Sequence, residues 1–159
     1  MVSAYQISLV VAAVLCTTVF GELFVFHSVV MPGIAKLDDA GFIRAFQVID
    51  GMVQGNEPQF VAIWIGSVIA IIVSLILSKG SDVLLWIASG LYILGQITTF
   101  TINVPFNNRL QKVDVANSHA TSLQEHRSRF EGPWNFWNTF RTVLFGLTSI
   151  GLSRILMKE

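Results

Sequence analysis

The stretch FVAIWIGSVIAIIVSLIL, residues 60–77, carries no charged side chain. A helix needs about 20 mostly apolar residues to cross the hydrocarbon core of a bilayer. The short segment SKGSD, residues 78–82, separates this stretch from a second apolar run, VLLWIASGLYILGQITTF, at residues 83–100. The pattern therefore predicts two antiparallel membrane helices joined by a tight turn.

Two further apolar segments flank this pair. One precedes it and is interrupted only by Glu22 and His27, and the other ends near the C-terminus with an arginine close to each end. The earlier segment has no basic n-region and is longer than a signal-peptide core, so we expect it to be retained. The sequence thus predicts an all-α fold, a single domain over residues 1–159. The predicted fold is an integral membrane antiparallel four-helix bundle with helices at about 5–31, 58–78, 82–104 and 134–157.

The composition supports a multi-pass membrane protein. Hydrophobic residues make up 53% of the chain and charged residues 13%, and the mean hydropathy is +0.64. These values are too apolar for an ordinary soluble domain, so the lipid bilayer is the expected partner. A formal net charge of zero gives no electrostatic footprint for nucleic acid. Cys16 is the single cysteine, which excludes an intrachain disulfide.

The first long connection contains DDAGFIRAFQVIDGMVQ, residues 38–54. Its apolar residues recur at spacings of three and four, which predicts an amphipathic helix at about 38–54 with Asp38 or Asp39 as its N-cap. Such a helix lies in the membrane interface or covers the end of the bundle. An interfacial tether and a gating lid both remain open readings of this segment.

Unusual polar residues gather at one predicted end of the bundle. An alternating path brings both long connections to the same side, together with four helix ends. These residues are Glu22, His27, Asn56, Gln59, Gln96, Asn103, Asn107, Asn108, Arg109, Trp134, Asn135, Trp137, Asn138 and Arg141. The positive-inside rule favours a cytoplasmic location for this polar end, with both termini on the other side.

Glu22 and Arg141 lie at comparable depth within the predicted helices, where ionisable groups are costly unless they are paired. They either form an ion pair that fixes helix register or line a pocket at the polar end. Asn138 and Arg141 share a helical face. Trp134 and Trp137 are either interfacial anchors or the wall of that pocket. His27 lies about 140° around the helix from Glu22, so the two need not face one cavity.

The segment TINVPFNNRL, residues 101–110, contains a proline that removes a backbone donor. We therefore expect the helix predicted at about 82–104 to end or kink near Pro105. Asn103, Asn107 and Arg109 would then project from an irregular segment lining a cavity. His119 and His126 share a helical face but lack a third metal ligand at compatible spacing, so no metal site is expected.

Three motifs together resemble the anthrone oxygenase-like family of small four-helix integral membrane proteins. They are VMPG at 30–33, NVPFNNRL at 103–110 and WNFWNTFR at 134–141. The family pattern N-x-P-x-N-x-x-L and W-x-x-W-N-x-x-R is met by Asn103, Pro105, Asn107, Leu110, Trp134, Trp137, Asn138 and Arg141. Fungal members are linked to polyketide pathways in which an anthrone is oxidised to an anthraquinone. The resemblance implies a hydrophobic aromatic small molecule as ligand and oxidation without a cofactor.

The candidate roles follow from that chemistry. Glu22 or His27 would act as the base, and Arg141 with Asn138 would stabilise the enolate oxygen. The residues assigned to substrate binding are Asn103, Asn107, Arg109, Trp134 and Trp137. The alternative is a non-catalytic membrane module that binds a quinone, a lipid or a partner subunit, because such a site needs the same groups. Homo-oligomerisation is compatible with either reading.

Overall fold

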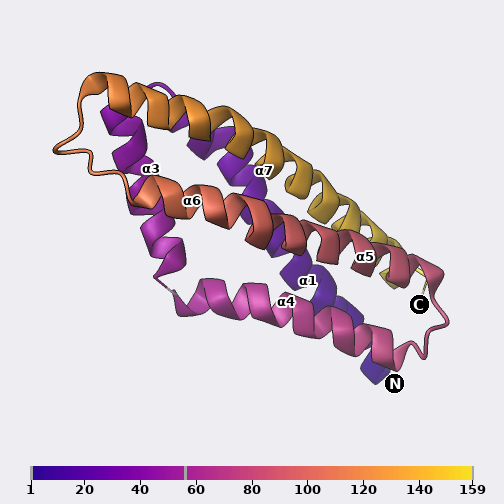
Figure 1. The fold of residues 1–159 in the computed structure, drawn as a ribbon. Coiled ribbons are helices and arrows are strands. Elements are labelled where there is room, and N and C mark those ends of the chain that lie inside the picture. Colours follow the sequence, from indigo (N-terminus) through magenta and orange to yellow (C-terminus); the bar gives the residue numbers. More distant parts are fainter. Residues whose placement is uncertain (1, 56, 159) are drawn as a thin grey trace.

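The computed structural model describes residues 2–55 and 57–158, and within these residues all regular secondary structure is helical, without strands. The first rod joins α1 (Ala4–Val25), the π-helical turn η1 (Phe26–Val30) and α2 (Met31–Ile34). Helix α3 (Asp39–Gln54) follows, and helix α4 (Pro58–Leu77) is the second rod. The third rod joins α5 (Val83–Thr98), the π-helical turn η2 (Thr99–Asn103) and α6 (Val104–Gln111). Helix α7 (Ala120–Leu156) is the fourth rod. This architecture confirms the all-α bundle (Figure 1).

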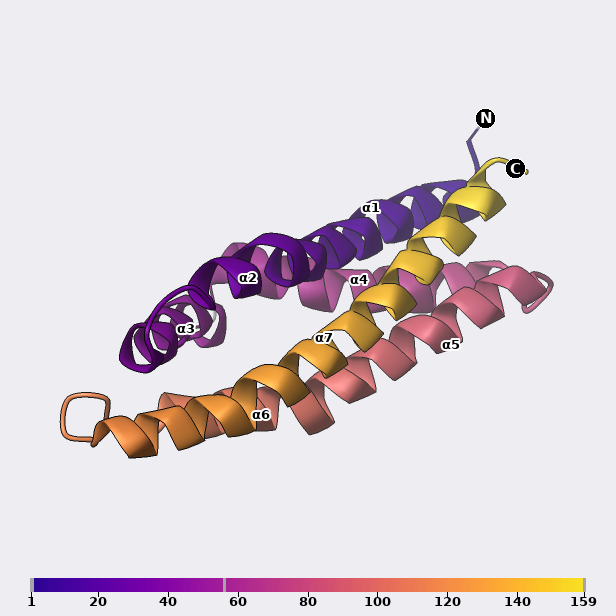
Figure 2. The ribbon, with the colours of Figure 1, turned by 90° about the horizontal axis from the view of Figure 1, so that it is seen from above.

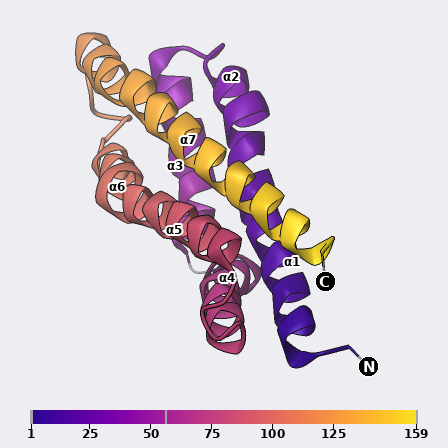
Figure 3. The ribbon, with the colours of Figure 1, turned by 90° about the vertical axis from the view of Figure 1, so that its right-hand side faces the viewer.

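The rods run alongside one another, and the two ends of the molecule carry different connections. The two chain ends and the α4–α5 turn lie at one end of the molecule, whereas α3 and the α6–α7 connection lie at the other (Figures 1 and 2). Helix α7 packs along α5 and α1, while α4 packs chiefly on α1 and barely touches α5 (Figure 3). The end that carries α3 is the polar end predicted from the sequence. Asn56 lies outside the described residues.

Local sequence signals explain where several helices begin. Ser3 and Gln6 form a capping box at α1. Asp38 accepts a hydrogen bond from Gly41 N at 2.7 Å, which confirms it as the N-cap of α3. Asp82 caps α5 by accepting from Leu84 N and Leu85 N. These caps satisfy backbone donors that would otherwise lack a partner at the start of a helix.

Two apolar clusters hold the rods together. The larger one surrounds Val19, Tyr92 and Phe145 between α1, α4, α5 and α7. The smaller one lies at the polar end, where Phe46 of α3 contacts the edges of two α7 rings. Since α3 buries its apolar face on α6 and α7, it covers the end of the bundle.

The prediction of an irregular segment around Pro105 is wrong, because the third rod continues as a helix to Gln111. A π turn absorbs the proline instead. Val104 N donates to Thr99 O across five residues, and Met31 N donates to Phe26 O in the same way just before Pro32. A proline in a helix crowds the carbonyl four residues earlier, and the wider turn before it makes room for the ring.

The last helix begins at Ala120 rather than near 134, and Pro133 lies inside it. Tertiary contacts explain the extra length. Arg127 donates to Ala35 O at 2.8 Å and to Leu37 O at 2.9 Å, and it pairs with Asp39 and Glu131. The hydrogen bond to Glu131 is the main reason that the pKa of Arg127 lies above its ordinary value. Arg127 therefore fastens the early part of α7 to the α2–α3 connection.

Three helical segments of the described chain are long and apolar enough to cross a membrane: Ala4–Ile34, Pro58–Leu77 and Val83–Gln111. The sequence predicts four, and α7 is not among them. Its apolar half includes Arg141 and Arg154, which lower its hydropathy. An exposed apolar stripe nevertheless follows this half of α7, at Phe136, Phe140, Val143, Leu147 and Ile150.

Candidate functional site

A cavity of about 350 Å³ lies at the polar end of the rods, between α1, α3, α4, η2, α6 and α7. Its wall is mainly apolar and aromatic. The aromatic lining residues are Phe26, Phe46, Phe60, Trp64, Phe100 and Trp134. The polar ones are Glu22, Asp50, Gln54, Thr99, Asn107 and Arg141. This combination of an aromatic wall with a few polar groups is typical of small-molecule sites.

Arg141 is buried and held in one orientation by three hydrogen bonds. Its Nε and Nη2 donate to Asn138 Oδ1 at 3.2 and 2.9 Å, and its Nη1 donates to Thr99 Oγ1 at 3.2 Å. Its guanidinium carbon lies 5.7 Å from the ring centroid of Trp134. Asn138 is fixed in turn, since its Nδ2 donates to Leu23 O. A guanidinium has five N–H donors, so two remain for a ligand oxygen.

Glu22 does not form the ion pair with Arg141 that one sequence reading proposed. Among the described residues, no ion pair involves Glu22, and its Oε2 instead accepts a hydrogen bond from Trp64 Nε1 at 2.9 Å. The carboxylate is half-buried and lies on the wall of the cavity. The anionic and cationic groups thus both face the cavity without pairing with each other.

A buried hydrogen-bond network extends from the cavity into α3. Trp134 Nε1 donates to Asn107 Oδ1 at 2.7 Å, and Asn107 Nδ2 donates to Asp50 Oδ1 at 2.6 Å. Asp50 also accepts from Gln54 and Gln111. A buried carboxylate with three amide donors is well compensated, and it fixes the orientation of the Asn107 amide.

Asp50 is a site residue that sequence reasoning missed. The signal was present, because Asp50 follows Phe42 and Phe46 at intervals of four and therefore lies on the apolar face of α3. A carboxylate on the buried face of an amphipathic helix is unusual and indicates partners from another element.

Several predicted site residues lie outside the cavity. His27 is exposed and contacts Thr139, on a different face from Glu22. Trp137 packs edge-on against neighbouring phenylalanines on the outside of α7. Arg109 is exposed at the end of α6. Asn103 is fully buried and makes a long contact with Trp134 O at 3.5 Å, but it does not line the cavity.

No group of three or more His, Cys, Asp or Glu side chains in the described part of the chain is arranged to hold a metal ion. His119 and His126 both lie near the start of α7.

The fold and site define a helical protein whose apolar helices fit a lipid bilayer and whose aromatic-lined cavity, with a few polar groups, lies at one end. The family model for anthrone oxygenase matches residues 52–151, and the chain belongs to this family. The resemblance of the sequence motifs is thereby confirmed. The match includes Asn107, Trp134, Asn138 and Arg141, whereas Glu22 precedes it. No curated protein and no solved structure matches the chain.

Proposed function

We propose that this chain is a multi-pass integral membrane oxygenase that oxidises an anthrone-like aromatic to the corresponding quinone in the cavity. One observation carries the proposal: Glu22 and Arg141 both face an aromatic-lined cavity and are not paired with each other. Proton abstraction next to a carbonyl needs a base and a donor to the developing oxyanion. Membership of the anthrone oxygenase family supports this choice of reaction.

The rim of the cavity favours an apolar substrate that dissolves in the bilayer. Ile65 of α4 and Phe100 of η2 line the cavity and are also 56% and 65% exposed. Both belong to segments with the length and hydropathy of membrane spans, so this side of the cavity would open toward lipid. The volume lies near the lower end of the roughly 300–1,000 Å³ found for small-molecule sites, which suits a flat tricyclic compound.

The first step is assigned to Glu22 and Arg141. The Glu22 carboxylate removes a proton from the acidic methylene carbon of the anthrone. Negative charge then develops on the carbonyl oxygen, where the two remaining N–H donors of Arg141 would bind it. Trp134 would stack on the flat ring system beside the guanidinium. Since Asn138 and Thr99 already orient Arg141, little reorganisation accompanies this charge.

Dioxygen supplies the oxidant. The enolate transfers one electron to O₂, and the resulting superoxide and carbon radical combine to form a C–O bond. The peroxide takes the proton back from Glu22. Glu22 then removes the second proton from the same carbon, the C=O bond forms as the O–O bond breaks, and hydroxide leaves with that proton as water. The balance is one anthrone and one O₂ giving one anthraquinone and one water.

Oxygen uptake by the purified protein with a simple anthrone tests this proposal. Glu22→Gln keeps an oxygen to accept from Trp64 Nε1 but cannot act as the base. Loss of a general base costs about 100-fold to 10,000-fold in turnover. Glu57→Gln, which changes an exposed carboxylate outside the cavity, is the matched control and should turn over normally.

Two outcomes would contradict the oxygenase. One is uptake no faster than the spontaneous background for the folded wild type, and the other is full activity in Glu22→Gln. Tight binding of an anthraquinone without turnover would instead establish the alternative, a non-catalytic membrane module.

A further inference from the structure

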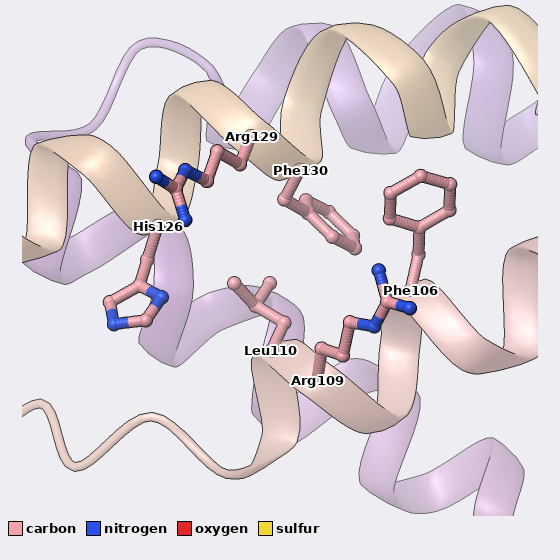
Figure 4. Close-up of a pocket in the computed structure, with 6 residues that line it drawn as sticks. All are labelled: Phe106, Arg109, Leu110, His126, Arg129 and Phe130. Carbon is pink, nitrogen blue, oxygen red and sulfur yellow. The ribbon is translucent and has the colours of Figure 1, made fainter.

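A second cavity, of about 300 Å³, lies between α6 and the early part of α7 and shares no lining residue with the first. Figure 4 shows the six side chains around it. Phe106, Arg109 and Leu110 come from α6, and His126, Arg129 and Phe130 come from α7. None of the steps assigned to the oxygenase uses this cavity.

Its floor is apolar and its rim is basic. Leu110 and Phe130 are buried, whereas Arg109 and Arg129 are exposed and lie on opposite helices. The Arg109 guanidinium carbon lies 5.9 Å from the ring centroid of Phe106. An amphiphile with an anionic group and an apolar portion is complementary to such a surface.

One of the two arginines that line this cavity has no counter-ion among the described residues. Arg129 pairs with Glu125 one turn earlier on α7. Arg109 makes no ion pair with any described residue. Guanidinium groups bind phosphate oxygens through paired hydrogen bonds, so Arg109 is the side chain of this cavity best suited to bind an anion.

The position along the rod indicates the source of the anion. Arg109 lies near the end of Val83–Gln111, a segment long and apolar enough to cross a bilayer, which places it at head-group depth in a spanning orientation. Basic pockets between membrane helices bind anionic head groups, and the positive-inside rule predicts that this end faces the leaflet that carries them.

We propose that this basic cavity binds the phosphate group of an anionic phospholipid, with Arg109 as its main ligand and Arg129 and His126 completing the rim. The first acyl carbons would lie against Phe106 and Leu110. A free phosphate has the same anionic chemistry without the apolar portion, so the two sources can be distinguished.

Native mass spectrometry of the full chain in neutral detergent tests the proposal through binding alone, independently of oxygenase activity. The probes are dioleoyl phosphatidylglycerol, dioleoyl phosphatidylcholine and inorganic phosphate. Phosphatidylglycerol should bind at least about tenfold more tightly than phosphatidylcholine, whose choline cation would be repelled by the arginines at the rim, and than inorganic phosphate, which lacks the apolar portion. Arg109→Gln should lose about tenfold in affinity, and Arg129→Gln should also weaken binding.

Arg154→Gln is the matched control, because it removes an exposed arginine of α7 at the opposite end of the molecule. It should retain the affinity of the wild type. Equal binding of the two lipids, or equal losses in Arg109→Gln and Arg154→Gln, would overturn the site. Inorganic phosphate binding as tightly as phosphatidylglycerol would overturn its assignment to a lipid.

Discussion

Exchanging the carboxylate and the amide between positions 50 and 107 probes the buried network that supports the cavity. Asp50 is 3% exposed and accepts hydrogen bonds from Asn107 at 2.6 Å, Gln54 at 2.6 Å and Gln111 at 2.8 Å. Asp50→Asn leaves one acceptor oxygen, so the new amide nitrogen must face another amide nitrogen. One charged hydrogen bond is lost and a buried donor is left without a partner. Together these should lower the free energy of unfolding by about 3 kcal/mol.

The reverse change is also unfavourable alone but compensates in combination. Asn107→Asp places a second carboxylate against Asp50, and like charges at hydrogen-bond distance repel strongly. In the double variant, the new amide at position 50 donates to the new carboxylate at position 107. The other oxygen of that carboxylate still accepts from Trp134 Nε1. We expect stability within about 1 kcal/mol of the wild type and a favourable coupling energy of at least about 2 kcal/mol.

Reversible unfolding in mixed micelles with increasing dodecyl sulfate, followed by circular dichroism, measures all four proteins of this cycle. The exposed pair Asp114 and Asn117 is the control, because its amide also donates to a carboxylate, at 2.7 Å. The hydrogen bonds from the side chain and backbone of Asn117 are the main reason that the pKa of Asp114 lies below its ordinary value. Exchanging that pair should change stability by less than about 0.5 kcal/mol, as is usual for surface positions. Additive losses at positions 50 and 107 would refute the network described here.

Three further substitutions test the packing. At Gly95 an added Cβ would lie 2.7 Å from the ring of Phe145, so Gly95→Ala should lower the unfolding free energy by about 1–3 kcal/mol. Gly90→Ala meets no atom within 4 Å and should raise it slightly, by about 0.5–1 kcal/mol, and equal effects in the same assay would contradict this difference. Arg127→Gln should loosen α3 from α7 and speed amide hydrogen exchange within α3, whereas unchanged exchange would show that Arg127 does not fasten it.

Much of the helical arrangement follows from the sequence because apolar runs and their connections are local features. The uncharged stretch at 60–77 and the short segment after it predict two helices joined by a tight turn, and the structure has them, although α4 packs chiefly on α1. The period of the 38–54 segment predicts α3, and Asp38 caps it as expected. Both long connections lie at one end, as the alternating path requires.

The errors arise where distant contacts override local preference. Pro133 favours the beginning of a helix, yet α7 extends thirteen residues earlier because Arg127 and Phe130 pack against α3. Pro105 favours a helix end, yet a π turn accommodates it. Neither the packing of α3 nor the wider turn has a strong local signature in one sequence.

Part of the site could be predicted because it depends on local helical spacing. Trp134, Asn138 and Arg141 lie together because helical spacing places them on one face of α7. Asn107 was expected in an irregular segment and instead reaches the cavity from helix α6. His27 lies outside the cavity, on another face of the first rod from Glu22. The importance of Asp50 depends on three amides from α3 and α6, a convergence that only the tertiary structure displays.

The two π turns make the cavity sensitive to chain length as well as to residue identity. One additional residue in a helix rotates everything beyond it by about 100°. Deleting one residue from η2 would preserve the rod but turn α6, carrying Asn107 away from both Trp134 and Asp50. Homologues or designs that keep every polar residue but lack this insertion would form similar rods around a different site. Alignments of such chains must therefore allow a single-residue gap just before Pro105.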